Sequence, residues 1–232
     1  MLGDLEGLKR DAAHAAVDRY LSSGMTVGLG SGTTSAFAVR RIGELLAGGE
    51  LRDVRGIPTS ERTAALAREV GIPLAALSEA RPVLTIDGAD EIGPDLTVIK
   101  GRGGALLREK IVAAASGELV IVADGSKPVE VLGVGPLPVE VEPFGWETTL
   151  EALTALGCEP TLRMDRADPH HPFVTDGGHY TADCLFPGIH APASLEAGIK
   201  RIPGALECGL FVGLTRAAVV AREGGVEITE AS

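Results

Sequence analysis

Four apolar segments in this chain are each followed by a short polar turn that contains glycine. The first, Met25–Leu29, runs into the turn Gly28–Thr34 and then a helical pattern that continues to Leu46. A second unit repeats this plan, with a strand near Val54–Ile57, Ser60 as a helix cap and a helix at Glu61–Glu69, and Pro73–Leu77 is a further strand candidate. Strands and helices that alternate in this way predict a mostly parallel, doubly wound sheet. The carboxyl ends of such strands meet at one edge of the sheet, where α/β proteins bind ligands. The other three strands with their turns are Val83–Ile86 with Asp87–Glu91, Leu96–Ile99 with Lys100–Gly104, and Leu119–Ala123 with Asp124–Lys127.

The pattern changes after the fourth turn. Residues 127–143 contain four prolines, which no helix would tolerate. The segments that follow alternate in the order β-α-β-β-α, which is typical of a small ferredoxin-like α+β domain. We therefore expect a Rossmann-like catalytic domain made of residues 1–132 and 206–232. A smaller α+β domain, residues 133–205, is inserted into it. The terminal strands, Leu210–Gly213 among them, are expected to rejoin the first sheet.

The charge and cysteine content narrow the classes of function. The formal net charge is −11 over 232 residues, and no basic patch is visible, so we expect no nucleic-acid partner. No apolar stretch reaches the ~18 residues of a membrane span, and the N-terminus does not resemble a signal peptide. The three cysteines form no Cys-x-x-Cys pair and are expected to be reduced. These features favour a cytoplasmic protein.

The first turn does not match the common nucleotide-binding motifs. A dinucleotide fingerprint requires Gly-x-Gly-x-x-Gly, but the third glycine here falls one place early, at Gly32. The Gly-Lys-Ser/Thr of a Walker loop is missing too. Ser31, Thr33 and Thr34 at the start of a helix suit a single phosphate or a sugar hydroxyl. A purely structural glycine turn is equally compatible with this motif.

The acidic run Asp87–Glu91 places three carboxylates within five residues at the end of a strand. Crowded carboxylates raise the pKa of at least one member, which is useful for proton transfer. Taken alone, such a run is more often a solvated loop or a cation site.

The segment Lys100–Gly104 could present backbone N–H groups to an anion, with Lys100 at its start. The helix predicted at Ala105–Ala115 then carries Glu109 between Arg108 and Lys110. By itself Glu109 fits an ordinary solvated helix charge.

Taken together, the four polar turns closely resemble those of the type A ribose-5-phosphate isomerases. Val174-Thr175-Asp176 adds to the match, as does the stretch from Pro138 to Glu147, and the similarity covers nearly the whole chain. The resemblance implies interconversion of ribose 5-phosphate and ribulose 5-phosphate in the pentose phosphate pathway. It also implies that no cofactor or metal is needed, and that the protein forms homodimers or homotetramers.

The resemblance assigns a role to each matching residue. Glu109 is similar to the catalytic base, and Asp87, Asp90 and Lys100 are similar to the supporting catalytic residues. Lys9 resembles a phosphate-contacting lysine, although few neighbouring residues carry this part of the match. The remaining substrate-binding positions are Ser31, Gly32, Thr33, Thr34, Gly88, Ala89, Gly101, Arg102, Gly103 and Lys127.

Three positions depart from the family pattern. Arg102 stands where glycine is usual, and Gly125 and Gly178 replace commoner loop residues. Arg102 either alters the local geometry of the loop or adds a cation for the phosphate.

Parts of the sequence are also compatible with three other kinds of function. His170 and His171, between Asp168-Pro169 and Pro172, suggest a metal, but their spacing fits no zinc pattern. A sugar-phosphate sensor would need a DNA-binding module, for which the chain before Met25 leaves no room. An acyl-transfer enzyme with a glutamate nucleophile would not need the phosphate-binding features.

Overall fold

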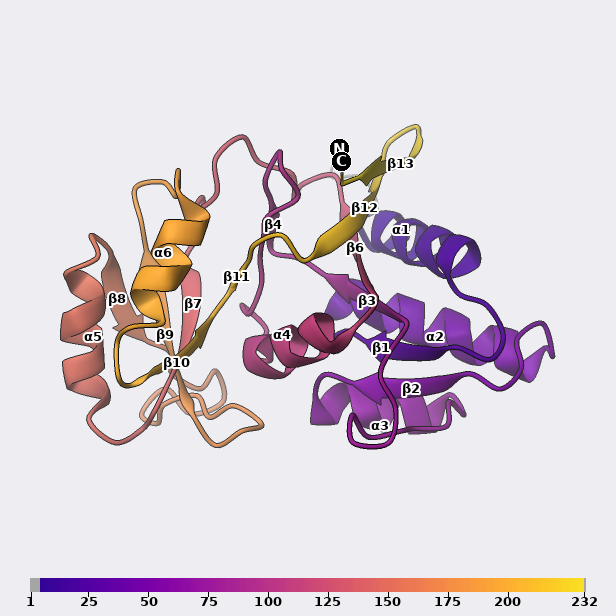
Figure 1. Cartoon of the computed structure of the whole chain (residues 1–232), viewed down its shortest axis with the longest axis horizontal. Helices are drawn as coiled ribbons and strands as arrows, with labels where there is room; N and C mark the ends of the chain where they lie inside the picture. Colours follow the sequence, from indigo (N-terminus) through magenta and orange to yellow (C-terminus); the bar gives the residue numbers. More distant parts are fainter. Residues whose placement is uncertain (1–4, 232) are drawn as a thin grey trace. The chain divides into compact units, whose positions relative to one another are not determined.

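The computed structural model describes residues 5–231, and their contacts divide the chain into two compact units (Figure 1). The first unit contains the chain up to Ala89, Arg108–Lys127 and the chain from Gly213 onward. The second contains Asp90–Leu107 and Pro128–Val212. This division places residues 90–107 with the smaller unit, whereas the expected domain bounds placed them in the catalytic domain. The expected bounds stay a prediction, and their residues 1–4 and 232 lie outside the described residues.

The first unit is built on a six-stranded sheet in the order β13-β12-β6-β3-β1-β2. All neighbouring strands are parallel except β13, which pairs antiparallel with β12. The mostly parallel sheet predicted from the alternating pattern is therefore confirmed. The strands are β1 Thr26–Leu29, β2 Arg55–Pro58, β3 Leu84–Gly88, β6 Glu118–Asp124, β12 Thr215–Arg222 and β13 Gly225–Glu230.

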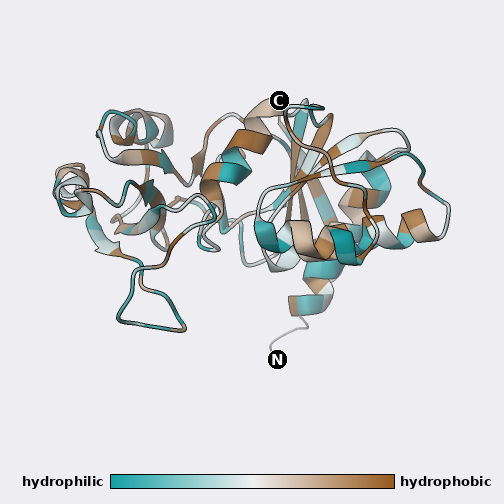
Figure 2. Ribbon diagram, turned by 90° about the horizontal axis from the view of Figure 1, so that it is seen from below, coloured by the Kyte–Doolittle hydropathy of each residue, from teal (hydrophilic) through white to brown (hydrophobic). Residues whose placement is uncertain are grey.

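Helices cover both faces of this sheet. On one face, Ala12 and Ala16 of α1 and Ile42 of α2 pack against Val120 and Val219 in a single apolar core. Small alanines let α1 lie close to the strands, and the strands are correspondingly hydrophobic (Figure 2). On the other face α4 packs through Val112 against Ile57 and Ala75. The helices are α1 Leu5–Tyr20, α2 Thr33–Ala47, α3 Glu61–Glu69 and α4 Leu106–Ala115.

The second unit contains an antiparallel sheet in the order β10-β7-β9-β8. Along the chain its elements follow the β-α-β-β-α order predicted from the sequence, with one further strand at the end. The cysteines Cys158, Cys184 and Cys208 are free thiols buried in its core. The elements are β7 Leu137–Val141, α5 Trp146–Thr154, β8 Glu159–Leu162, β9 Tyr180–Leu185, α6 Pro192–Ile199 and β10 Ala205–Cys208.

A separate three-stranded sheet corrects two predictions. It has the order β11-β5-β4, with β4 at Glu91–Ile92, β5 at Val98–Ile99 and β11 at Leu210–Phe211. The strand before Lys100 was expected in the parallel sheet, and Leu210–Gly213 was expected to rejoin it. Both expectations are wrong, because these segments pair with each other, antiparallel. The strand predicted at Pro73–Leu77 is wrong too, since that segment forms one isolated bridge, between Leu74 and Gly56.

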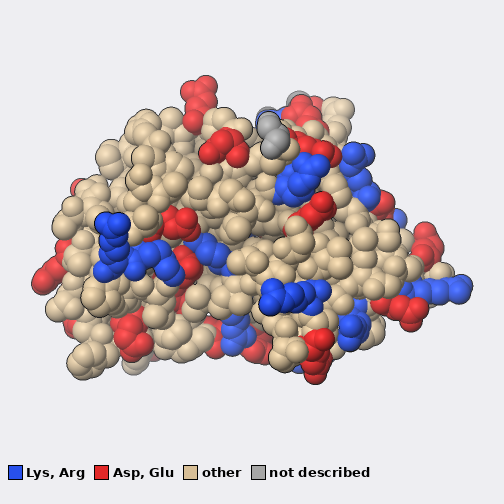
Figure 3. All heavy atoms as spheres, in the orientation of Figure 1, with Lys and Arg blue, Asp and Glu red and all other residues tan. Residues whose placement is uncertain are grey.

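No helix among residues 5–231 is both long and apolar enough to span a membrane. On the face drawn in Figure 3, lysines and arginines are interspersed with acidic side chains.

Candidate active site

In the first unit, Asp87 lies at the end of β3 with its side chain almost fully buried, at 1% exposure. Its Oδ1 atom accepts N–H bonds from Ser31 at 3.1 Å and from Gly88 at 2.8 Å. The hydroxyl of Ser35 lies 3.1 Å from the same atom. Gly30 allows this close packing, since a Cβ there would lie 2.1 Å from Oδ1. The glycine turn after β1 therefore packs directly on the carboxylate of Asp87. This carboxylate is buried and hydrogen-bonded, and does not lie in a solvated loop.

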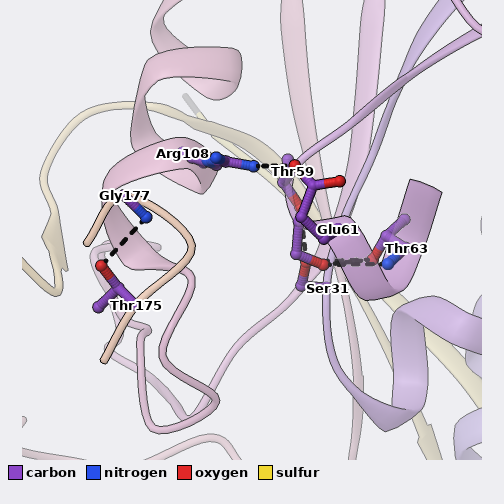
Figure 4. A network of polar contacts seen from close by, with 8 residues as sticks. Ser31, Thr59, Glu61, Thr63, Arg108, Thr175 and Gly177 are labelled. Atoms are coloured by element: carbon purple, nitrogen blue, oxygen red, sulfur yellow. Dashed lines mark hydrogen bonds and ion pairs between the residues drawn. The ribbon is translucent and has the colours of Figure 1, made fainter. Parts of the chain in front are cut away.

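The side chain of Ser31 takes part in a cluster of four hydroxyls (Figure 4). Its Oγ lies 2.8 Å from Thr59 Oγ1, 2.7 Å from Ser60 Oγ and 3.1 Å from Thr63 Oγ1. Ser60 also caps α3 as predicted, because its Oγ accepts the N–H of Thr63. Thr59 and Thr63 were not predicted to be neighbours of the glycine turn. The available signal was the polar pair Thr59 and Ser60, directly after the strand Arg55–Pro58.

The start of α2 follows the same turn. Gly32 is the N-cap residue with φ of 106°, and no side chain caps the helix from that position. Thr33 is exposed and Thr34 is buried. The first N–H groups of a helix without a side-chain cap remain available to an anion.

At the end of β6, Asp124 forms a second polar centre. Burial raises its pKa, but hydrogen bonds from the hydroxyl and the backbone N–H of Ser126 outweigh this, so that the pKa is lowered overall. The positive charges of Lys127 and Lys9 lower it further. This electrostatic effect places both lysines near the carboxylate. Lys9, whose assignment rested on little sequence, therefore lies near the end of a central strand.

Glu109 lies in the first turn of α4 and is only 5% exposed. Lys110 is buried as well, at 8%, whereas Arg108 is partly exposed and bonds Glu61 at 2.8 Å (Figure 4). The alternative of an ordinary solvated helix charge is thus wrong for Glu109. A buried carboxylate is costly to retain without a role or a compensating group.

In the second unit, Lys100 and Asp90 are held close to the three-stranded sheet. Lys100 is 3% exposed, and its Nζ lies 5.5 Å from the centre of the Phe211 ring. Its N–H donates to the carbonyl of Gly209 at 2.9 Å. Asp90 donates its own N–H to Ile99, and its Oδ2 accepts the N–H of Arg102 at 2.9 Å.

Two glycines of the loop before α4 cannot readily be replaced by other residues. Gly101 has φ of 102°, and a Cβ there would lie 2.7 Å from Leu106. Gly104 has φ of 83°, and its Cβ would lie 2.4 Å from the ring of Phe173. Arg102, the departure from the family pattern, directs its guanidinium to the buried carboxylate of Glu91. The predicted site residues are therefore divided between the units. Asp87, Gly88, Ala89, Glu109, Lys9, Lys127 and residues 31–34 belong to the first, and Asp90, Lys100, Gly101, Arg102 and Gly103 to the second.

The histidine pair suggested as a metal site lies on the surface. His171 Nδ1 bonds Asp168 at 2.7 Å, and its side chain is 74% exposed. Among residues 5–231, the one group with ligand atoms close enough to hold a metal contains Glu196, Glu207 and Cys208, without histidine. Glu207 there already bonds Lys200 at 2.9 Å.

The fold and these sites define an α/β protein with acid–base side chains at its strand ends, beside helix N-termini. The family model of ribose 5-phosphate isomerase A (phosphoriboisomerase A) matches residues 55–225. Ribose-5-phosphate isomerase A of Gloeobacter violaceus is 56% identical over 228 residues, covering 97% of this chain and 96% of that protein. The chain belongs to this family.

Solved structures agree with this membership. A D-ribose-5-phosphate isomerase in complex with phospho-erythronic acid superimposes with a TM-score of 0.95 at 36% identity, covering 98% of this chain and 99% of that one. The ribose 5-phosphate isomerase from Plasmodium falciparum gives a TM-score of 0.92 at 40% identity, covering 97% and 98%. The Rossmann-like α/β fold predicted from the sequence is thus confirmed.

Proposed function

We propose that this protein interconverts D-ribose 5-phosphate and D-ribulose 5-phosphate through an enediolate, as a step of the pentose phosphate pathway. Family membership over nearly the full chain supports the reaction. The structural observation that carries the mechanism is the burial of Glu109 at the start of α4. In an aldose–ketose isomerase one base can take the proton from C2 and return it to C1. While the proton is on the base, the oxygen of the neighbouring carbonyl carries the negative charge of the enediolate.

We assign the base to Glu109 and the stabilising cation to Lys100. A positioned carboxylate contributes about 10²–10⁴-fold to proton transfer. The enediolate oxygen needs preorganised positive charge, which a buried ammonium supplies. Ribose 5-phosphate is mostly a closed furanose, so a proton shuttle must first open the ring. Asp87 is the first candidate for this step and Asp90 the second.

We assign phosphate and sugar binding to residues 31–34, Lys9 and Lys127. The uncapped start of α2 offers N–H groups, and both lysines lie near Asp124. An anchored phosphate would position C1 and C2 for the reaction. The sugar phosphate is the one partner this mechanism requires, and no metal or cofactor enters it. A homodimer or homotetramer in the cytoplasm is the proposed state, and sedimentation of the purified protein measures the assembly.

The deciding experiment compares the unmodified protein, Glu109→Gln and Glu223→Gln in EDTA. Glu223 is an exposed control between β12 and β13. We expect the unmodified protein and Glu223→Gln to produce ketopentose phosphate, and Glu109→Gln to lose at least about 100-fold in kcat. Binding of phospho-erythronic acid, measured by calorimetry, should persist in Glu109→Gln. No conversion by the unmodified protein would refute the function, and a near-normal Glu109→Gln would remove Glu109 as the base.

A further inference from the structure

The turn Gly101–Arg102 holds the carboxylate of Asp90. The N–H of Arg102 donates to Asp90 Oδ2 at 2.9 Å, so the peptide between Gly101 and Arg102 sets where that carboxylate lies. Gly101 has a positive φ of 102°. Glycine adopts positive and negative φ about equally readily, so without further contacts the backbone would leave this conformation easily. Something must therefore fix this peptide if Asp90 is to keep one position.

The side chain of Arg102 ties the turn to a buried carboxylate. Its Nη2 donates to Oε1 of Glu91, a carboxylate that is only 2% exposed. Glu91 is also bonded by the N–H groups of Gly133, Val134 and Gly135, at 2.7, 3.2 and 2.7 Å. Gly135 leaves room for the guanidinium, because a Cβ there would lie 2.5 Å from Arg102 Nη2. A carboxylate bonded this completely is a fixed anchor, and Arg102 ties the turn to it.

Arg163 also fixes this turn, through its backbone carbonyls. It follows β8, and its Nη1 donates to the carbonyls of Gly101 at 3.0 Å and Arg102 at 3.3 Å. Its guanidinium is itself held by a two-point ion pair with Asp183 of β9, in which Nε lies 2.8 Å from Oδ2. The Arg163 and Asp183 side chains are 14% and 22% exposed. Paired guanidinium–carboxylate contacts of this kind fix geometry as well as charge.

We propose that Arg102 and Arg163 are positioning residues that hold the Gly101–Arg102 peptide, and through its N–H the carboxylate of Asp90, for the ring-opening step. Ring opening removes the proton from the C1 hydroxyl, breaks the bond between C1 and the ring oxygen, and returns a proton to that oxygen. Arg102 then acts through Asp90 and does not contact the phosphate. This inference rests on the proposed isomerase function, within which it gives Asp90 a part in opening the ring.

The test separates ring opening from enolisation. The C5 oxygen of ribulose 5-phosphate carries the phosphate, so this ketose cannot close to a furanose. Exchange of its C1 hydrogen with D2O therefore reports proton abstraction alone, whereas conversion of ribose 5-phosphate requires ring opening as well. Arg102→Met and Arg163→Met remove the donors, Arg102→Lys and Arg163→Lys keep the charge, and Arg201→Ala is an exposed control in the same unit.

We expect the methionine variants to convert ribose 5-phosphate roughly tenfold more slowly in kcat, the scale of one lost charge-assisted hydrogen bond. KM and the C1 exchange rate should stay within about twofold, the lysine variants should lie between, and Arg201→Ala should match the unmodified protein. If conversion and exchange fall together, or if Arg102→Met raises KM at unchanged kcat, the proposal is overturned. The second outcome would make Arg102 a phosphate cation.

Hydrogen exchange of the Arg102 amide gives a readout that needs no catalysis. We expect its protection to fall at least about tenfold in Arg163→Met and in Asp90→Ala, and to be unchanged in Arg201→Ala. Unchanged protection in Arg163→Met would overturn the proposal even if activity fell. If the unmodified protein neither converts ribose 5-phosphate nor exchanges the C1 hydrogen of ribulose 5-phosphate, the isomerase function is refuted. Exchange of the Arg102 amide still tests whether Arg163 and Asp90 hold the Gly101–Arg102 peptide.

Discussion

Ser31 donates its backbone N–H to Oδ1 of Asp87 at 3.1 Å, which joins the turn after β1 to the end of the neighbouring strand β3. Ser35, in the first turn of α2, completes this contact. Its Oγ lies 3.1 Å from the same carboxylate oxygen and accepts the N–H of Gly88 at 2.9 Å. One buried hydroxyl thus links the helix to two consecutive residues of the acidic run.

We expect Ser35→Ala to destabilise the protein by about 0.5–1.5 kcal/mol, because it removes the hydroxyl that bonds both Asp87 Oδ1 and the N–H of Gly88. Isomerase kcat should fall as well, since Asp87 loses a contact that orients it. Urea denaturation and steady-state kinetics measure both effects. Ser78→Ala, at an exposed position, is the control. A Ser35→Ala protein that matches the control would show that the hydroxyl has no such role.

Gly30→Ala should be more damaging than its size suggests. The new Cβ would lie 2.1 Å from Asp87 Oδ1 and 2.5 Å from Asp87 Cα, and the backbone of a central strand cannot move aside. We expect a loss of about 1–3 kcal/mol in the free energy of unfolding and a large loss of kcat. Gly198→Ala in α6 is the matched comparison, since its Cβ would meet Leu156 at an ordinary 3.6 Å. That change should be neutral, or stabilising by up to about 1 kcal/mol. Equal effects of the two would refute the steric argument.

A substitution at Ser31 distinguishes a role of its hydroxyl in substrate binding from a role in stability. Its hydroxyl is directed into the cluster with Thr59, Ser60 and Thr63, while its N–H contacts Asp87. We expect Ser31→Ala to lower the melting temperature and to leave KM for ribose 5-phosphate within about twofold, because the binding proposed for residues 31–34 then rests on backbone N–H groups and not on this hydroxyl. A marked rise of KM with an unchanged melting temperature would return the Ser31 hydroxyl to the substrate.

The lowered pKa of Asp124 predicts how the stability of the folded protein depends on pH. Its pKa is lowered in the folded protein, so its contribution to stability is present above the unfolded value of about 3.9. This contribution is lost as the pH falls through the lower, folded pKa. We expect the melting temperature of Asp124→Asn to lie below that of the unmodified protein at pH 7, and the difference to shrink below about pH 4. Asp11→Asn, an exposed control, should show little difference at either pH. A difference that grows in acid would contradict the sign of the shift.

The sequence predicted those helices and strands that depend on residues close together in the chain. Ser60 followed by an apolar-periodic segment predicted the helix that the structure has at Glu61–Glu69. The parallel sheet followed from the alternation of elements. The placement of Val98–Ile99 did not, because its partner Leu210–Phe211 is more than a hundred residues away. An apolar pattern indicates a strand but carries no information about which strand it pairs with.

The candidate site shows the same limit. The side chains at strand ends were predicted, because topology alone places them there. The burial of Glu109 was not, since its neighbours in the sequence are charged and its burial depends on tertiary packing. Arg102 could be recognised as unusual, but its pairing with Glu91 required the loop geometry. Arg163 and Asp183 gave no signal, because their role depends on contact with a turn some 60 residues earlier in the chain.

The three-segment make-up of the first unit has a consequence for synthesis on the ribosome. Strand β12 lies between β6 and β13 in the finished sheet, yet in the chain it follows β6 only after the long segment Pro128–Val212 of the second unit. All of that segment is therefore translated before β12. Until β12 has been made, β6 has an open edge where β12 will pair. A nascent chain, or one terminated before β12, would expose this apolar edge to other chains, so β12 also protects against aggregation.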